Sequence, residues 1–140
     1  MFTRDIYDKV LSQLEMHNFV FLTGPRECGK SVCLTQIAST VSNTKYLDFK
    51  NMIDDERFDA LELVFNSFHD NEEVTYLLDE ITYIPLFDIQ IGKIQEVYTK
   101  QVALYTIPRT KVVFASSQSV ALDYLSSKYF GGMVGKVCVK

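Results

Sequence analysis

The chain has 140 residues, a formal net charge of −4 and 47% hydrophobic residues. This length suits one domain with a single core, and the hydrophobic content excludes a disordered chain. No apolar run approaches the roughly 20 residues of a membrane-spanning helix, and 18 acids against 14 bases give nucleic acid no general attraction. The three cysteines, Cys28, Cys33 and Cys138, are an odd number without zinc-ligand spacing and predict reduced thiols in a cytoplasmic protein.

Helical and strand patterns alternate along the first half of the chain. Residues 3–16 predict an amphipathic helix, and residues 19–22 predict a strand buried on both faces. A second helix starts at Lys30, a second strand covers 45–49, and a third helix covers about 55–69. The buried faces of these two helices are expected to hold Leu34, Ile37, Ala38 and Val41, and Phe58, Leu61, Phe65 and Phe68. Acids crowd the flanks of the third helix, which predicts a solvated outer face that repels phosphate backbones.

The alternation continues through the second half. Strands are predicted at 74–78, 111–115 and 133–140. A long helix follows Pro85 and stops before Pro108, and a shorter one ends near Gly131-Gly132. The buried stripes should hold Phe87, Ile91, Ile94, Tyr98, Val102 and Tyr105 in the long helix, and Val120, Leu122 and Leu125 in the short one. Together these elements predict an α/β fold in which helices cover both faces of a parallel sheet.

A glycine-rich loop joins the first strand to the second helix. It matches the phosphate-loop pattern G-x-x-x-x-G-K-[ST], in which glycines let the backbone approach phosphate and the helix dipole attracts negative charge. We expect Lys30 to reach the β and γ phosphates and the Ser31 hydroxyl to ligate Mg²⁺. The predicted nucleotide-binding residues are Gly24, Pro25, Arg26, Glu27, Cys28, Gly29, Lys30, Ser31 and Val32.

Two acids end the third predicted strand. Asp79 and Glu80 follow the apolar residues 76–78, at the sheet edge where ligands bind in open parallel sheets. Acids also end strands simply to be solvated, but a phosphate loop one crossover upstream favours a functional pair. We expect Asp79 to hold Mg²⁺ through its water shell, and Glu80 to orient or deprotonate an attacking water.

A run of short hydroxyl side chains follows the fourth predicted strand. If that strand lies between the first and the third, these side chains sit beside the γ-phosphate. Ser117 is the first candidate for a phosphate-sensing catalytic residue, and Ser116 is the second. Ser119, directly before Val120, is better suited to capping the helix that follows.

The sequence also resembles the prokaryotic AAA-type ATPases of the P-loop NTPase superfamily. The resemblance rests on residues 21–26 and 29–31, on Tyr46-Leu47-Asp48, and on Leu77-Leu78-Asp79-Glu80-Ile81 with Tyr83-Ile84-Pro85, and it spans nearly the whole chain. It implies a three-layer αβα fold with a five-stranded sheet in the order 5-1-4-3-2, and ATP rather than GTP as the nucleotide. Members usually carry Thr-Gly-Ser where this chain has Ala115-Ser116-Ser117.

The resemblance also bears on domain organisation and partners. Members continue into a helical lid and further C-terminal domains, whereas this chain stops at Lys140 on its last predicted strand. We therefore expect residues 1–140 to be a single ATPase core domain taken from a longer protein. An unidentified protein partner is expected, a homo-oligomer of the full-length protein stays open, and neither a membrane nor nucleic acid is expected to bind this domain.

Three functions remain open at this point. The leading one is Mg²⁺-dependent hydrolysis of ATP to ADP and phosphate. The second is an ATP-dependent binding switch with little intrinsic hydrolysis, and the third is a small-molecule kinase. The kinase ranks lowest, because the sequence shows no basic lid segment and because a glutamate beside the metal-binding aspartate suits water as the acceptor. Cys28, inside the phosphate loop, adds a minor hypothesis of redox control.

Overall fold

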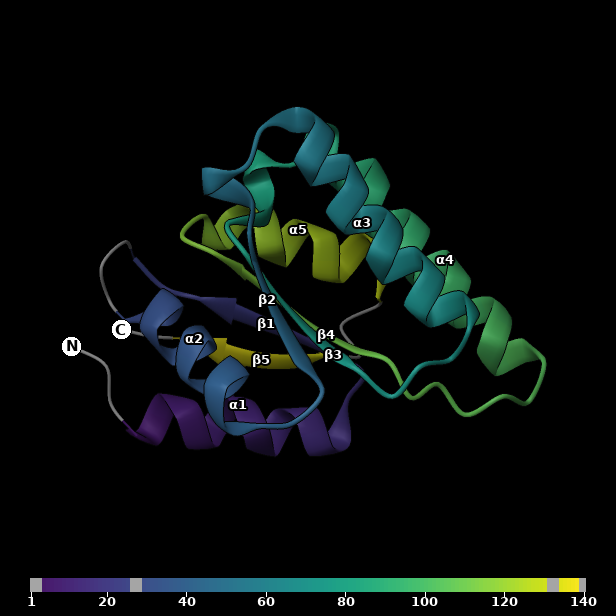
Figure 1. Cartoon of the computed structure of the whole chain (residues 1–140), viewed down its shortest axis with the longest axis horizontal. Coiled ribbons are helices and arrows are strands. Elements are labelled where there is room, and N and C mark those ends of the chain that lie inside the picture. The colour runs from purple at the N-terminus through teal and green to yellow at the C-terminus, as the bar shows by residue number, and fades with distance from the viewer. Residues whose placement is uncertain (1–3, 26–28, 131–133, 139–140) are drawn as a thin grey trace.

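The computed structural model describes residues 4–25, 29–130 and 134–138. Strands and helices alternate along the described chain (Figure 1). The strands are β1 (Phe19–Thr23), β2 (Thr44–Asp48), β3 (Thr75–Asp79), β4 (Lys111–Ser116) and β5 (Gly135–Cys138). The helices are α1 (Arg4–Met16), α2 (Lys30–Thr40), α3 (Asp54–His69), α4 (Phe87–Ala103) and α5 (Ser119–Tyr129), with the 3₁₀ turns η1 (Phe49–Asn51) and η2 (Ile81–Tyr83).

The strands form one five-stranded sheet in the order β2-β3-β4-β1-β5. Every neighbouring pair is parallel, and β4 lies between β1 and β3. Read from the other edge, this is the predicted order 5-1-4-3-2, so the fold prediction is confirmed. The carboxyl ends of all five strands therefore meet at one edge of the sheet.

Helices cover both faces of the sheet and make two hydrophobic cores. Figure 1 shows α1 and α2 on one face, and α3, α4 and α5 on the other. Val10 and Ile37 belong to the first core, whereas Phe19, Phe68 and Phe114 belong to the second. Strands β1, β3 and β4 send side chains into both cores, which explains why their sequences are continuous apolar runs rather than alternating patterns.

Part of the buried stripe predicted for the long helix α4 is wrong. It ends at Ala103, Val102 is 47% exposed, and Tyr105 is 96% exposed beyond the helix end. A helix of this length extends for about 25 Å, whereas a six-residue strand such as β4 extends for about 20 Å. The helix consequently runs past the sheet that it covers, as Figure 1 also shows, and its last apolar side chains meet no core.

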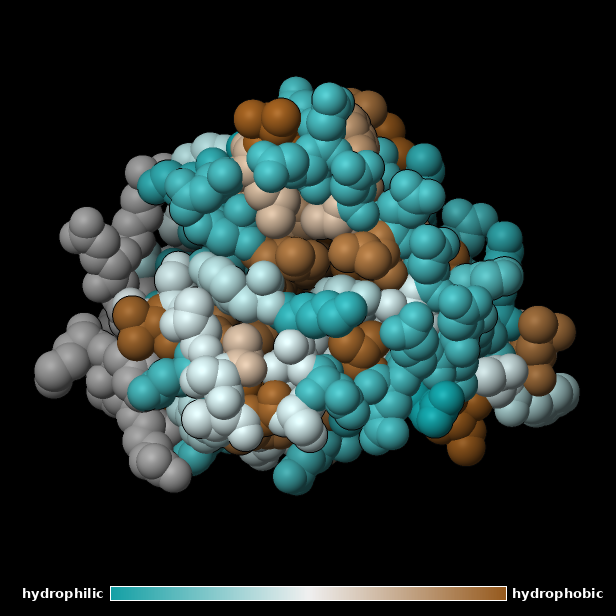
Figure 2. Space-filling model, viewed as in Figure 1, coloured by the Kyte–Doolittle hydropathy of each residue, from teal (hydrophilic) through white to brown (hydrophobic). Residues whose placement is uncertain are grey.

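Smaller corrections concern the ends of other elements. Val41 follows α2 instead of lying within it, and Phe49, predicted as the end of a strand, begins η1. Phe58 is 44% exposed and Val120 is 81% exposed, so neither belongs to a buried helix face. Hydrophilic side chains dominate the molecular face over α3 (Figure 2), in agreement with the solvated surface predicted there.

Candidate nucleotide site

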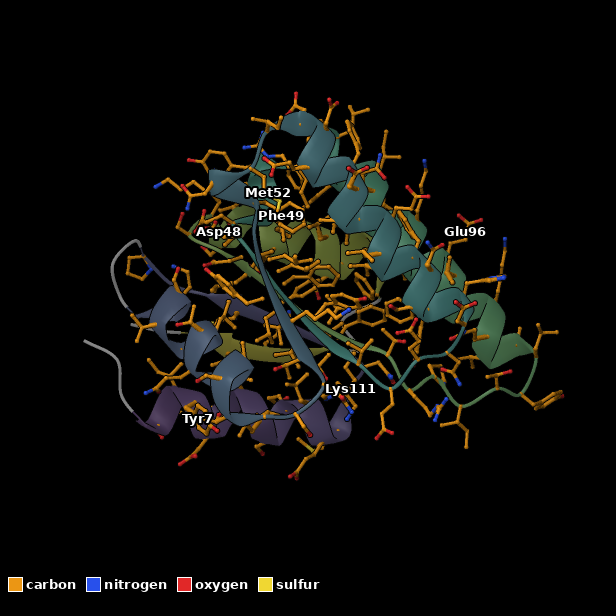
Figure 3. The ribbon with its side chains drawn as sticks, in the orientation of Figure 1. Tyr7, Asp48, Phe49, Met52, Glu96 and Lys111 are labelled. Atoms are coloured by element: carbon orange, nitrogen blue, oxygen red, sulfur yellow. The ribbon has the colours of Figure 1, made fainter. Side chains whose placement is uncertain are left out.

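The carboxyl edge of the sheet gathers the residues that the sequence singled out. Asp48 and Asp79 end the paired strands β2 and β3 in register, and Ser116 pairs with Thr23 at the ends of β4 and β1. Figure 3 shows Asp48 at this edge and Lys111, which starts β4, at the opposite one. The parallel arrangement therefore brings side chains from distant parts of the sequence to one place.

The described part of the glycine-rich loop folds around Lys30. The Lys30 side chain is buried, and its Nζ donates hydrogen bonds to the carbonyl oxygens of Gly24 (2.8 Å) and Pro25 (3.0 Å). A buried ammonium group must be surrounded by oxygen atoms, because leaving a desolvated charge unpaired costs several kcal/mol or more. Lys30 thus lies across the loop, as a phosphate-binding lysine must. Arg26, Glu27 and Cys28 lie outside the described residues.

The start of α2 has features that favour an anion. Gly29 occupies the N-cap position with φ of 100°, a left-handed conformation that favours glycine, and no described side chain caps the helix there. Ser31 and Val32 lie exposed in its first turn. The first backbone N–H groups of a helix have no partner within it, and the positive end of the dipole adds to their attraction for phosphate.

The Asp79 carboxylate is the best-defined polar centre of the site. It is 1% exposed, and its Oδ2 accepts hydrogen bonds from Ser31 Oγ (2.5 Å) and from Tyr46 Oη (2.7 Å). Its Oδ1 is buried and has no hydrogen-bond partner within the described residues. Burial, together with the hydrogen bond to Asp79, raises the pKa of Tyr46, so its hydroxyl remains a donor at neutral pH. The sequence motifs predict Ser31 and Asp79 as metal ligands, whereas no motif assigns Tyr46 a role in the site.

Glu80 and Ser117 also come together. Glu80 has φ of 54°, which is uncommon for a residue with a side chain, and its Oε2 lies 3.4 Å from Ser117 Oγ. Ser116 is buried, and its hydroxyl accepts a hydrogen bond from the backbone N–H of Gln118 (2.9 Å). The predicted cap at Ser119 is wrong, because Gln118 holds the N-cap position without a side-chain hydrogen bond and Ser119 is the first helical residue.

The donor set of this site suits Mg²⁺. The ion prefers oxygen ligands, keeps several waters and needs only one or two groups from the protein. Ser31 offers a hydroxyl oxygen, and the buried Oδ1 of Asp79 needs a hydrogen-bond donor, which a water of the ion's shell can supply. In the described chain, no group of three or more His, Cys, Asp or Glu side chains could hold a metal ion.

Two of the cysteines can be placed. Cys33 lies on the buried face of α2, and this burial raises the pKa of its thiol to about 11, so the thiol is unreactive at neutral pH. Cys138 is exposed at the end of β5, where its Sγ accepts a hydrogen bond from Thr23 Oγ1 at 3.2 Å. The redox hypothesis concerns Cys28, which lies outside the described residues, and it stays a prediction. No helix in the described part of the chain is long and apolar enough to cross a membrane.

Solved structures share this fold. The Walker-type ATPase PABY2304 of Pyrococcus abyssi superposes with a TM-score of 0.74 at 14% identity, over 100% of this chain and 54% of its own. A DNA replication initiation factor superposes with a TM-score of 0.57, also at 14% identity, over 98% of this chain and 44% of its own. The chain thus spans about half the length of each of these two proteins. At this identity the likeness establishes the fold alone.

Sequence comparison identifies the family. No curated protein sequence matches the chain. A family profile described as an AAA domain matches residues 16–137, which include the glycine-rich loop, the acidic end of β3 and all five strands except the last residue of β5. The strand order of the sheet and the contact between Ser31 and Asp79 are consistent with this family match. The chain therefore belongs to the AAA domain family and is an AAA-type P-loop NTPase domain.

Proposed function

We propose that this domain binds ATP together with Mg²⁺ and hydrolyses it to ADP and phosphate. The observation that carries the proposal is the contact of 2.5 Å between Ser31 Oγ and Asp79 Oδ2, which joins the glycine-rich loop to the acidic end of β3. A phosphate loop alone would bind an anion. Together with a buried carboxylate at the sheet edge, it forms a site for a nucleotide and its metal ion.

Each residue has a distinct role in this proposal. The loop N–H groups and Lys30 bind the phosphates, and Lys30 exchanges the carbonyls of Gly24 and Pro25 for phosphate oxygens when ATP enters. Ser31 and Asp79 would hold Mg²⁺, which would supply positive charge beside the phosphates. Glu80 accepts a proton from the attacking water while a bond forms between water oxygen and the γ-phosphorus and the bond to ADP breaks. Ser117, beside Glu80, contacts the γ-phosphate or the water.

Turnover of ATP by wild type and by Glu80→Gln tests the proposal. General-base catalysis contributes roughly 100- to 10,000-fold, so we expect Glu80→Gln to bind ATP normally and to release phosphate at least 100-fold more slowly. Equal rates would remove Glu80 from the mechanism. Tight binding without phosphate release by the wild type would identify the switch instead, and transfer of the γ-phosphate to a metabolite would identify a kinase.

The wider biological setting belongs to the proposal too. Because the chain spans about half of the two similar proteins, a lid and further domains beyond these residues remain predictions, as do an unidentified protein partner and a homo-oligomer. The acidic surface of α3 supports the expectation that this domain does not bind nucleic acid by itself. The cytoplasmic location predicted from the odd number of cysteines also stays a proposal.

A further inference from the structure

The hydroxyl of Tyr46 touches the carboxylate of the proposed metal site. Tyr46 lies on β2, the edge strand of the sheet, in register with Leu77 of β3. Its Oη donates to Asp79 Oδ2 at 2.7 Å, and Ser31 Oγ donates to the same oxygen. Asp79 is therefore held from two sides by hydroxyl groups that come from different elements, α2 and β2.

These two hydrogen bonds make the two carboxylate oxygens unequal. Rotation about the last side-chain bond of an aspartate is loosely restricted, and in a symmetrical environment either oxygen could take either place. Here Oδ2 accepts both hydroxyl groups, while Oδ1 is buried without a partner in the described chain. Tyr46 adds to this asymmetry from a half-buried position on a strand, whereas Ser31 is exposed in the first turn of α2.

A serine hydroxyl can ligate a metal ion and donate a hydrogen bond to a carboxylate at the same time. Its oxygen lone pair faces the cation while its proton continues to point at the carboxylate. A tyrosine hydroxyl that donates to the same carboxylate oxygen does not compete with this arrangement. It leaves the second oxygen to accept a hydrogen bond from a metal-bound water. The contacts around Asp79 thus fit a role for the Tyr46 hydroxyl in orienting the carboxylate without contacting the metal ion itself.

We propose that Tyr46 is a positioning residue for Mg²⁺, acting through Asp79. This inference rests on the proposed function, because it assigns a role within the same site. Partners that orient a metal-binding group usually change metal affinity by about 10- to 100-fold when they are removed. We expect the lower end of that range, because Ser31 still holds Asp79 when Tyr46 has lost its hydroxyl.

The test compares Tyr46→Phe with Tyr76→Phe. Both changes remove one phenol hydroxyl from a strand, but Tyr76 is buried within the second core and its hydroxyl bonds Ser67 Oγ (2.6 Å) on α3. With nucleotide saturating, the electron paramagnetic resonance signal of Mn²⁺ reports metal affinity directly and without turnover. Nucleotide affinity in excess EDTA is measured on the same variants.

Tyr46→Phe should weaken Mn²⁺ binding about 10-fold and leave nucleotide affinity in EDTA unchanged. Tyr76→Phe should leave both affinities unchanged. Equal Mn²⁺ affinity for Tyr46→Phe and wild type would overturn the inference, and so would an equal loss of nucleotide affinity in EDTA. If Tyr46→Phe folds poorly, Tyr46→Leu is measured against the same criteria. If the wild type itself binds neither nucleotide nor Mn²⁺, the proposed function fails, which is a separate outcome.

Discussion

The two edges of the sheet use buried polar side chains in different ways. At the amino edge, Asn18 Nδ2 donates to the carbonyls of Pro108 and Thr110, and Thr110 Oγ1 donates to those of Ser67 and Glu72. These side chains bond backbone carbonyls and so hold loops in place. At the carboxyl edge, Asp79 instead accepts bonds from two side-chain hydroxyls and keeps one buried oxygen without a described partner.

We attribute the difference to the proposed nucleotide site at the carboxyl edge. A buried polar atom without a hydrogen bond costs about 1–3 kcal/mol, and a side chain in the left-handed region, as at Glu80, adds to the cost. Such costs persist where binding or catalysis requires them. At the amino edge, the comparable turn at Asn71 uses a residue type that tolerates positive φ, and its side chain also bonds the backbone of Ile107 and Arg109. At the carboxyl edge both costs fall on Asp79 and Glu80, the acids of the proposed nucleotide site.

The largest effect on ATP affinity is expected from Lys30→Ala. Hydrogen bonds to charged groups contribute about 1.5–3 kcal/mol, so the affinity should fall roughly 10- to 150-fold. Lys111→Ala is the matched control, because Lys111 lies at the amino edge and its Nζ bonds the carbonyl of Leu14. Calorimetric titration with ATP would measure both variants. An unchanged affinity in Lys30→Ala would remove the glycine-rich loop from the site.

Thr110→Val should act on stability and not on nucleotide binding. The change keeps the shape of a fully buried side chain and removes the hydroxyl that donates to the carbonyls of Ser67 and Glu72, which keep their backbone N–H donors. We expect the free energy of unfolding to fall by roughly 1 kcal/mol, measured by urea denaturation. ATP affinity should equal that of the wild type. A variant with normal stability and weakened ATP binding would contradict the distinction between the two edges.

Glu80→Gly should be more stable than Glu80→Ala by about 0.5–1 kcal/mol, since glycine accepts a positive φ at little cost. The exposed helical residue Asp123 provides the control, because there glycine should be less stable than alanine by about 1 kcal/mol. Urea denaturation of the four variants gives both differences. The same sign at both positions would show that the backbone at Glu80 is not strained.

The smallest effect is expected from Ser117→Ala. Its hydroxyl lies 3.4 Å from Glu80 Oε2, which is long for a hydrogen bond. A contribution of about 0.5–1 kcal/mol corresponds to a two- to fivefold slower release of phosphate. Ser119→Ala should have no effect, because Ser119 is an exposed first residue of α5. A fall in turnover of 100-fold would show that Ser117 contributes far more than one neutral hydrogen bond.

The sequence predicted much of this domain because its signals are local. The glycine-rich loop lies between a continuous apolar strand and an amphipathic helix, and Asp79 and Glu80 are neighbours in the chain. Each of these features can be recognised within a few residues, and parallel strands must place their carboxyl ends together. The order of the sheet came from the resemblance to a known family, since periodicity alone does not say which strands are neighbours.

Other features depend on residues that are distant in sequence. Tyr46 meets Asp79 only because β2 pairs with β3 in a register that sets Tyr46 beside Leu77, and a shift of one residue would turn its side chain to the other face. The burial of Val102 and Tyr105 was predicted wrongly for a related reason. Periodicity describes a helix, but the length of the sheet beneath it decides where burial ends. Local patterns determined the elements and the nucleotide loop, while strand register and relative element lengths, which no local pattern encodes, decided what surrounds Asp79.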